Sequence, residues 1–150
     1  MDIMQFDVLA ESLRHESAAS LAEYGFPLIE GYTVTERDIS EVETHLDVIL
    51  PELYKAFMIH YGGGMFGSVE LFPIVSHDSG DENLRSVNDR EFPDRTFIAV
   101  APVGTGDHWG FPVTSSRCHD EVWFRSHDAG KPELDAADFL EFVARHGCRA

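Results

Sequence analysis

The apolar and polar positions of residues 35–64 fit two consecutive helices joined by a tight corner. Apolar residues recur at the spacing of one helical face, at Ile39, Val42 and Leu46. Thr35 precedes them as a good N-cap, because its hydroxyl can accept from the first free backbone N–H groups. Pro51 suits the start of the second helix, where its missing N–H costs no hydrogen bond. We predict that this helix ends at Gly62, since glycine adopts the left-handed conformation without a steric penalty.

The remaining segments alternate between helical and strand patterns. A long N-terminal helix is expected first, followed by a connector, and strand signals begin only after Gly62-Gly63-Gly64. The predicted elements are a helix over 4–24, a connector over 29–34 that can form a short strand, a strand over 69–74, a surface helix over about 81–89, three antiparallel strands within 96–125 and a closing helix that Asp135 caps and Gly147 ends.

The order of these elements indicates the fold class. Helices come first, antiparallel strands follow, and one helix closes the chain, which favours an α+β fold over a doubly wound parallel sheet. We expect a central antiparallel sheet with flanking helices in a single domain. Within it, residues 1–29 form an N-terminal helical extension packed on a domain of residues 30–150.

Charge narrows the choice of partner. The chain has 27 Asp and Glu against 11 Lys and Arg, a formal net charge of −16, and the acids are spread along its whole length. Direct nucleic-acid binding is therefore not expected, because phosphate recognition needs clustered basic residues. Solubility alone accounts for such a surface, and so does attraction to a cationic partner, whose association rate the field would raise.

Nothing in the sequence predicts export or a membrane partner. The N-terminus carries acids where a signal peptide carries Lys or Arg, and no apolar run approaches membrane-spanning length. Two cysteines, Cys118 and Cys148, are too few for a disulfide scaffold. We expect a cytoplasmic protein with reduced thiols, and one disulfide between the two stays open.

Four neighbouring His and Asp pairs raise the question of a metal site, because zinc and iron bind imidazole and carboxylate. Adjacent strand residues point to opposite faces, however, so such a pair rarely supplies two ligands to one ion. The spacings HxxxH, HExxH and CxxC do not occur. We therefore predict local turn hydrogen bonds at these pairs, and no metal or other cofactor. The pairs are His77-Asp78, Asp107-His108, His119-Asp120 and His127-Asp128.

Other candidate residues also have ordinary structural explanations. Cys118 and His119 are neighbours in sequence, whereas a thiol nucleophile and its base are paired in space. Asp107 follows two glycines, so we expect it to accept from backbone amides in a hairpin turn. Trp109 and Trp123 fit the core or a sheet face, although an exposed Trp would be a candidate anchor for a partner.

The motifs taken together resemble the SUKH superfamily, of the Smi/Knr type. The resemblance covers roughly residues 30–146. Its first part is a capped helix with a Leu-Pro corner, an aromatic helix and a glycine end: Ile39, Glu43, Leu46, Leu50, Pro51, Tyr54, Phe57, Gly62, Gly63 and Gly64. Its second part is a GxGD turn, an aromatic strand, a strand ending in His-Asp and a terminal helix: Gly104, Gly106, Asp107, Trp109, Phe111, Val122, His127, Asp128, Phe139 and Phe142. Many relatives have Asn at the place of Gly62.

The resemblance implies a binding role. Bacterial members are commonly immunity proteins that neutralise secreted toxins, often nucleases, and fungal members regulate cell-wall synthesis through partners. The family has no accepted catalytic residues. We therefore hypothesise a non-enzymatic immunity protein, monomeric or weakly dimeric, that binds a cationic toxin domain. The expected partner-binding residues are Asp78, Asp81, Glu82, Asp107, Trp109 and Asp128.

Two alternatives from other classes remain. A regulatory or scaffold module without a toxin is the first, and a toxin reading frame immediately upstream would count against it. The second is a small metal-dependent hydrolase, which elemental analysis of the purified protein would dismiss if Zn, Fe and Mn were absent.

Overall fold

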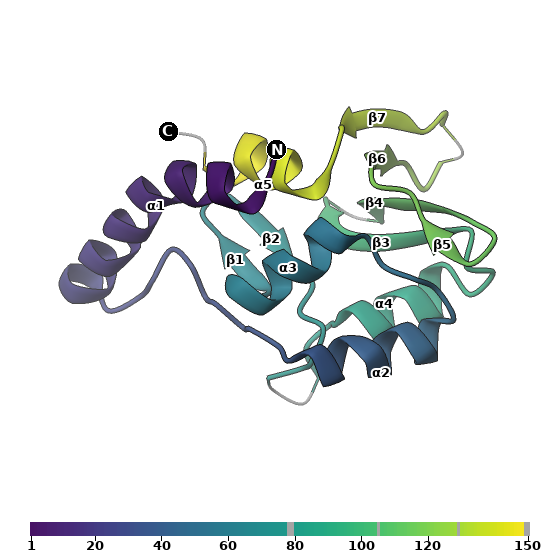
Figure 1. Cartoon of the computed structure of the whole chain (residues 1–150), viewed down its shortest axis with the longest axis horizontal. Coiled ribbons are helices and arrows are strands. Elements are labelled where there is room, and N and C mark those ends of the chain that lie inside the picture. Colours follow the sequence, from purple (N-terminus) through teal and green to yellow (C-terminus); the bar gives the residue numbers. More distant parts are fainter. Residues whose placement is uncertain (78–79, 105, 129, 149–150) are drawn as a thin grey trace.

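Five helices surround two antiparallel sheets in the part of the chain that this computed structural model describes, residues 1–77, 80–104, 106–128 and 130–148 (Figure 1). The helices are α1 (Ile3–Tyr24), α2 (Glu36–Leu46), α3 (Glu52–His60), α4 (Leu84–Glu91) and α5 (Phe139–His146). The small sheet contains β1 (Gly64–Phe66) and β2 (Val69–Leu71). The larger sheet contains β3 (Phe97–Val103), β4 (Asp107–Thr114), β5 (Arg117–Cys118), β6 (Val122–Arg125) and β7 (Glu133–Ala136).

The larger sheet confirms the α+β prediction. Its strands follow the order β3-β4-β6-β7, with β5 beside β4, and every named pair is antiparallel. The expected meander within 96–125 is therefore present. Phe72 N–H donates to Val100 O at 2.9 Å, which joins the end of the small sheet to β3.

Two apolar clusters cover opposite faces of the larger sheet, because successive strand residues point to opposite sides. Ile98 and Val100 of β3 enter the main core, whereas Phe97 and Ala99 enter a smaller cluster with Val87 of α4. This alternation explains why β3 is apolar at consecutive positions: both of its faces are buried.

The main core joins the helices on one side of the larger sheet to the small sheet. Phe57 of α3 contacts the rings of Phe6, Phe66 and Phe139 at centroid distances of 5.6, 5.3 and 5.2 Å. Such edge-on aromatic contacts stabilise a core beyond the area that they bury. Helix α1 thus belongs to the same hydrophobic core as the segments after residue 30.

The corner between α2 and α3 is held by side chains of its own. Thr35 forms a reciprocal capping box with Asp38 at the start of α2. Glu43 Oε2 accepts from Leu50 N–H at 2.8 Å and from Lys55 Nζ at 3.4 Å, so its carboxylate ties the corner to both helices. Gly62 has a φ of 85°, and a Cβ there would lie 2.3 Å from the Tyr32 carbonyl carbon. The chain therefore turns where we predicted, at a position where in this structure an added Cβ would meet the backbone of Tyr32 and Thr33.

One buried amide protects the edge of β3. Asn88 of α4 is 0% exposed; its Oδ1 accepts from Ala99 N–H at 2.8 Å, and its Nδ2 donates to Ala99 O at 2.9 Å and to Leu84 O at 2.8 Å. The amide thus makes both hydrogen bonds that a neighbouring strand would make to this residue.

Several boundaries differ from the prediction. The prediction that Asp135 caps the last helix is wrong: Asp135 lies in β7, and Asp138 caps α5 by accepting from Glu141 N–H. Strands β1, β5 and β7 were not predicted. They are only two to four residues long, too short for an alternating pattern to identify them from the sequence. The surface helix begins at Leu84, because Asn83 is its cap.

Candidate functional site

Acidic residues from two loops, the start of β4 and the end of α4 lie at one edge of the larger sheet. We call this surface the acidic loop edge and define it by Asp81, Glu82, Glu91, Asp107 and Asp128. Arg90 Nη2 contacts Glu82 at 2.6 Å and Arg90 Nε contacts Glu91 at 3.1 Å, which fixes these two carboxylates relative to each other. The loops thus present carboxylates whose positions are set by hydrogen bonds.

Asp107 and His127 tie two of these loops together. Asp107 Oδ1 accepts from His127 N–H at 3.0 Å and lies 2.6 Å from Nδ1 of the same residue. Pairing of β4 with β6 brings these residues together, since His108 lies opposite Arg125 in the register. The two later pieces of the SUKH-like pattern, the GxGD turn and the strand ending in His-Asp, therefore meet in space.

Hydrogen bonds shift the pKa values of the titratable side chains on this edge. The pKa of Asp107 is lowered by the backbone N–H of His127 and by its ring, and the pKa of His127 is raised by the hydrogen bond that its ring makes to Asp107. The Ser126 hydroxyl and the Gly130 N–H lower the pKa of Asp128. These carboxylates remain ionised at neutral pH and available to a cation.

His108 connects this edge to the buried interior. Its ring lies 5.6 Å from that of Phe92, and burial lowers the pKa of the imidazole. The negative charges of Glu91, Glu82 and Asp107 oppose that shift, so carboxylates from three segments face one ring.

A hollow of about 520 Å³ opens beside the acidic loop edge. Its lining includes Glu91, Phe92, Arg125, His127 and Pro132. The Arg125 guanidinium lies over the ring of Phe92 at 5.5 Å and over that of Phe97 at 5.4 Å. Sequence reasoning missed Phe92 and Arg125, because nothing in their local pattern shows that α4 and β6 approach each other across β3 and β4.

One expected site residue, Trp109, does not join this edge. Trp109 points to the opposite sheet face, where its ring contacts Phe142 at 5.2 Å and His146 at 4.6 Å. It is half-buried against α5. Asp78 lies outside the described residues, and the ring of His77, its neighbour, lies 4.0 Å from that of Tyr32 in a tilted arrangement.

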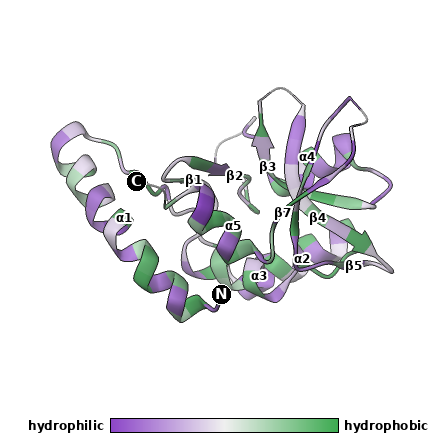
Figure 2. Ribbon diagram, turned by 90° about the horizontal axis from the view of Figure 1, so that it is seen from above, coloured by the Kyte–Doolittle hydropathy of each residue, from purple (hydrophilic) through white to green (hydrophobic). Residues whose placement is uncertain are grey.

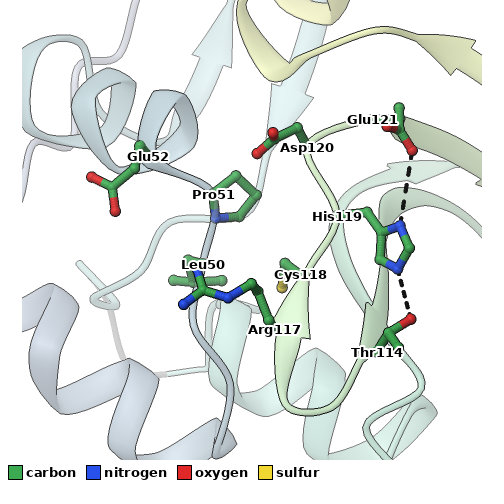
Figure 3. A pocket seen from close by; sticks show the side chains of 9 residues that line it. All are labelled: Leu50, Pro51, Glu52, Thr114, Arg117, Cys118, His119, Asp120 and Glu121. Atoms are coloured by element: carbon green, nitrogen blue, oxygen red, sulfur yellow. Dashed lines mark hydrogen bonds and ion pairs between the residues drawn. The ribbon is translucent and has the colours of Figure 1, made fainter.

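A second hollow, of about 400 Å³, lies at the Leu-Pro corner (Figure 3). In Figure 3 the segment Leu50–Glu52 faces the segment Arg117–Glu121 across it. Three carboxylates, Glu52, Asp120 and Glu121, line it against the single guanidinium of Arg117. The lining of this hollow is therefore also acidic.

The corner hollow contains a thiol and an imidazole, but they are not paired. His119 Nε2 lies 2.7 Å from Thr114 Oγ1 and Nδ1 lies 3.9 Å from Glu121, so both ring nitrogens face other partners. Burial raises the pKa of the Cys118 thiol to about 12, which keeps it protonated and poorly nucleophilic. Cys118 and Cys148 are both free thiols, as expected.

Within residues 1–77, 80–104, 106–128 and 130–148, no three His, Cys, Asp or Glu side chains are grouped as metal ligands would be. Over the same residues, no helix combines the length and the hydropathy that a transmembrane span needs.

Fold and site together define a small α+β scaffold that presents fixed carboxylates on its loops. A family model described as SUKH_6, SMI1-KNR4 cell-wall, matches residues 36–143, more than two thirds of the chain. The chain therefore belongs to the SUKH superfamily, as its motifs predicted. No curated protein matches it significantly.

Proposed function

We propose that this protein is a non-enzymatic binding module, and that it acts as a cytoplasmic immunity protein for a cationic toxin domain. Membership of the SUKH superfamily is the observation that carries the proposal. The acidic loop edge supports it, because its carboxylates are already held in place and would lose little conformational freedom on binding. Cys118 is protonated, and the ring of His119 faces Thr114 and Glu121 rather than the thiol, so this hollow offers no activated nucleophile, which supports a binding role over catalysis.

In this mechanism the net charge of −16 attracts the basic domain, and the acidic loop edge then contacts it. Electrostatic steering raises association rates by about 10- to 1000-fold and weakens as salt screens the charges. Phe92, half-buried beside Arg125 in the adjoining hollow, is the nearest aromatic surface for an apolar side chain of the partner. A toxin that binds phosphate would have its basic surface covered.

Co-expression with the neighbouring reading frame, followed by affinity purification, tests the proposal. We expect a complex whose association rate falls as ionic strength rises. The double variant Glu82→Gln/Asp128→Asn should slow association, whereas Glu11→Gln/Glu70→Gln, with the same change of net charge at exposed positions elsewhere, should slow it less. Equal effects from both variants would show that only net charge matters and would remove the acidic loop edge from the proposal.

A regulatory or scaffold role is the second candidate. It is favoured by the description of the matched family, which names the cell wall. The two functions differ in the partner that is recovered. Recovery of an endogenous cell-wall enzyme or regulator from the native host, with no protection against the neighbouring gene product, would support the regulatory role.

A further inference from the structure

A groove of about 470 Å³ lies between α2 and α3, the two helices on either side of the Leu-Pro corner. The helices lie side by side in both ribbon views (Figures 1 and 2). Ile39 of α2 and Ala56 and Ile59 of α3 form the apolar floor of the groove, and Ile59 packs against the main core. We call this surface the interhelical groove. It shares no residue with the acidic loop edge or with the hollow beside that edge.

Carboxylates from both helices line the groove. Glu36 and Glu43 come from α2, and Glu52 is the first residue of α3. Among the described residues of the lining, Lys55 is the one lysine or arginine, and His60 lies at the end of α3. Glu36 is exposed and the side chain of Glu52 is 87% exposed, so both carboxylates are open to another cation.

The position of Lys55 shows which chemistry the groove binds. Its Nζ lies 3.0 Å from Glu52 Oε1 and 3.4 Å from Glu43 Oε2, so one ammonium bridges a carboxylate of each helix. Burial alone would lower the pKa of Lys55, but the hydrogen bond to Glu52 and the charge of Glu43 outweigh this, and the ammonium stays charged. Long basic side chains place their alkyl stems on apolar surface and keep their charged ends at polar groups. The groove offers both kinds of surface.

The acidic lining continues beyond the groove. Glu52 also lines the corner hollow of Figure 3, so the two hollows adjoin at this residue. The corner hollow adds Asp120 and Glu121 against the guanidinium of Arg117. The described lining of both hollows thus includes five carboxylates and two permanently charged basic side chains. A cationic segment is attracted to such a surface, whereas a second copy of the chain, with a formal charge of −16, is repelled from it.

We propose that the interhelical groove docks a short basic segment of the partner protein, with arginine or lysine stems on the apolar floor and their charged ends at Glu36 and Glu52. Three apolar side chains make a narrow floor, which suits the stems of single basic residues better than the broad apolar face of an amphipathic helix. The inference rests on the proposed function for the identity of the partner, whereas the chemistry of the segment follows from the lining. The groove would give that partner a second contact besides the acidic loop edge.

An NMR titration of the isotope-labelled full chain with a basic peptide tests the proposal at near-physiological salt. The probe is a capped hexapeptide of alternating arginine and alanine, and its counterpart has glutamate in place of arginine. We expect amide shifts concentrated within residues 36–60 and 117–121, and no binding of the glutamate peptide. Glu36→Gln/Glu52→Gln should weaken binding of the arginine peptide about 5- to 10-fold. Glu11→Gln/Glu70→Gln, the same change of net charge at exposed positions elsewhere, should weaken it less than about 2-fold.

A further variant has the opposite expected sign. Lys55→Gln releases Glu43 and Glu52 from their internal cation, so the arginine peptide should bind about 3-fold more tightly than to wild type. Lys131→Gln makes the same change of net charge at an exposed loop position and should have a smaller effect. Because damage to the fold does not tighten binding, this pair of variants separates contact with the groove from disturbance of the corner.

Other results would overturn the proposal. Shifts spread over the whole surface, or equal effects of the two double variants, would mean adsorption by net charge alone. Shifts confined to residues 81–82, 107 and 128 would assign the peptide to the acidic loop edge. Equal affinity for spermidine would mean that the groove recognises any multivalent amine rather than a protein segment. A toxin complex that Glu36→Gln/Glu52→Gln leaves unchanged would preserve the proposed function and reject the groove, whereas peptide binding in the groove without any toxin complex would do the reverse.

Discussion

Replacement of Asn88 tests the account of how β3 is held. In Asn88→Leu, a side chain of similar volume, the N–H and C=O of Ala99 lose their partners in a fully buried environment. Each unsatisfied buried group costs about 1–3 kcal/mol, so the two together predict a loss of about 2–6 kcal/mol in the free energy of unfolding. Leu84 O adds less, because it lies inside α4, where the helix supplies its own hydrogen bonds.

Urea unfolding followed by tryptophan fluorescence measures this loss. Trp123 packs against the cluster that contains Ala99, so its emission reports on this face of the sheet. With a typical slope of about 2 kcal/mol per molar urea, a loss of 3 kcal/mol lowers the midpoint by about 1.5 M. Arg85→Leu, an exposed position on the same helix, is the control and should change stability by no more than about 0.5 kcal/mol.

A second variant separates the hydrogen bonds from packing. Asn88→Asp keeps an acceptor for Ala99 N–H but removes both donors and brings a carboxylate into a site with 0% exposure. We expect it to be less stable than Asn88→Leu at neutral pH, because an unpaired charge costs more to bury than a missing hydrogen bond. If Asn88→Leu lost less than about 1 kcal/mol and kept slow exchange at Ala99 N–H, the reasoning would be refuted.

Three further predictions concern Gly62 at the end of α3, Tyr54 in the core and His127 at the acidic loop edge. Gly62→Ala should cost more than about 2 kcal/mol in urea unfolding, whereas Gly25→Ala, also at positive φ but with nothing within 4 Å of the added Cβ, should cost about 1 kcal/mol; equal losses would contradict the steric argument. Tyr54→Phe should be neutral or stabilising by up to about 1 kcal/mol, because no described residue bonds its buried hydroxyl; a clear loss of stability would reveal a partner. The pKa of His127, measured by NMR, should exceed 6.5 and fall towards it in Asp107→Asn; no change would rule out the pairing.

The shifted pKa values of His127 and Asp107 also determine how the stability of the fold depends on pH. Because the folded pKa of His127 lies above the unfolded value of 6.5, its stabilising contribution is complete below pH 6.5 and disappears as pH rises through the folded pKa. Asp107 behaves oppositely: its pKa is lowered from 3.8, so its contribution is present above that value and is lost as pH falls through the folded pKa.

Local signals account for the parts of the fold that were predicted correctly. Thr35, Pro51 and Gly62 each act within one turn of their own position, and the structure places a cap, a helix start and a left-handed residue there. No such local signal shows whether Asp135 or Asp138 caps α5. Both precede the apolar face of α5, and it is the pairing of β7 with β6 that draws residues 133–136 into the sheet.

In the candidate site, too, some features follow from local sequence and others depend on strand pairing. Asp107 and Asp128 were expected on loops at one edge, and in the structure they follow β3 and β6, which flank β4 on either side and run in the same direction. The hydrogen bond between Asp107 and His127 spans 20 residues and depends on the register of β4 with β6, which no single segment encodes. The direction of Trp109 depends on that register too: burial of His108 on one sheet face sends Trp109 to the other.

The contribution of α1 to the core has a consequence for work with fragments. A polypeptide cut at the start of the SUKH_6 match would lack Phe6, whose ring contacts Phe57, Tyr61 and Phe66 within 6 Å. Those three rings would be exposed to water, and the shortened protein should aggregate or bind detergent. The family match therefore begins at residue 36, whereas the segment that folds as one core begins before Phe6. Deletion variants should keep α1.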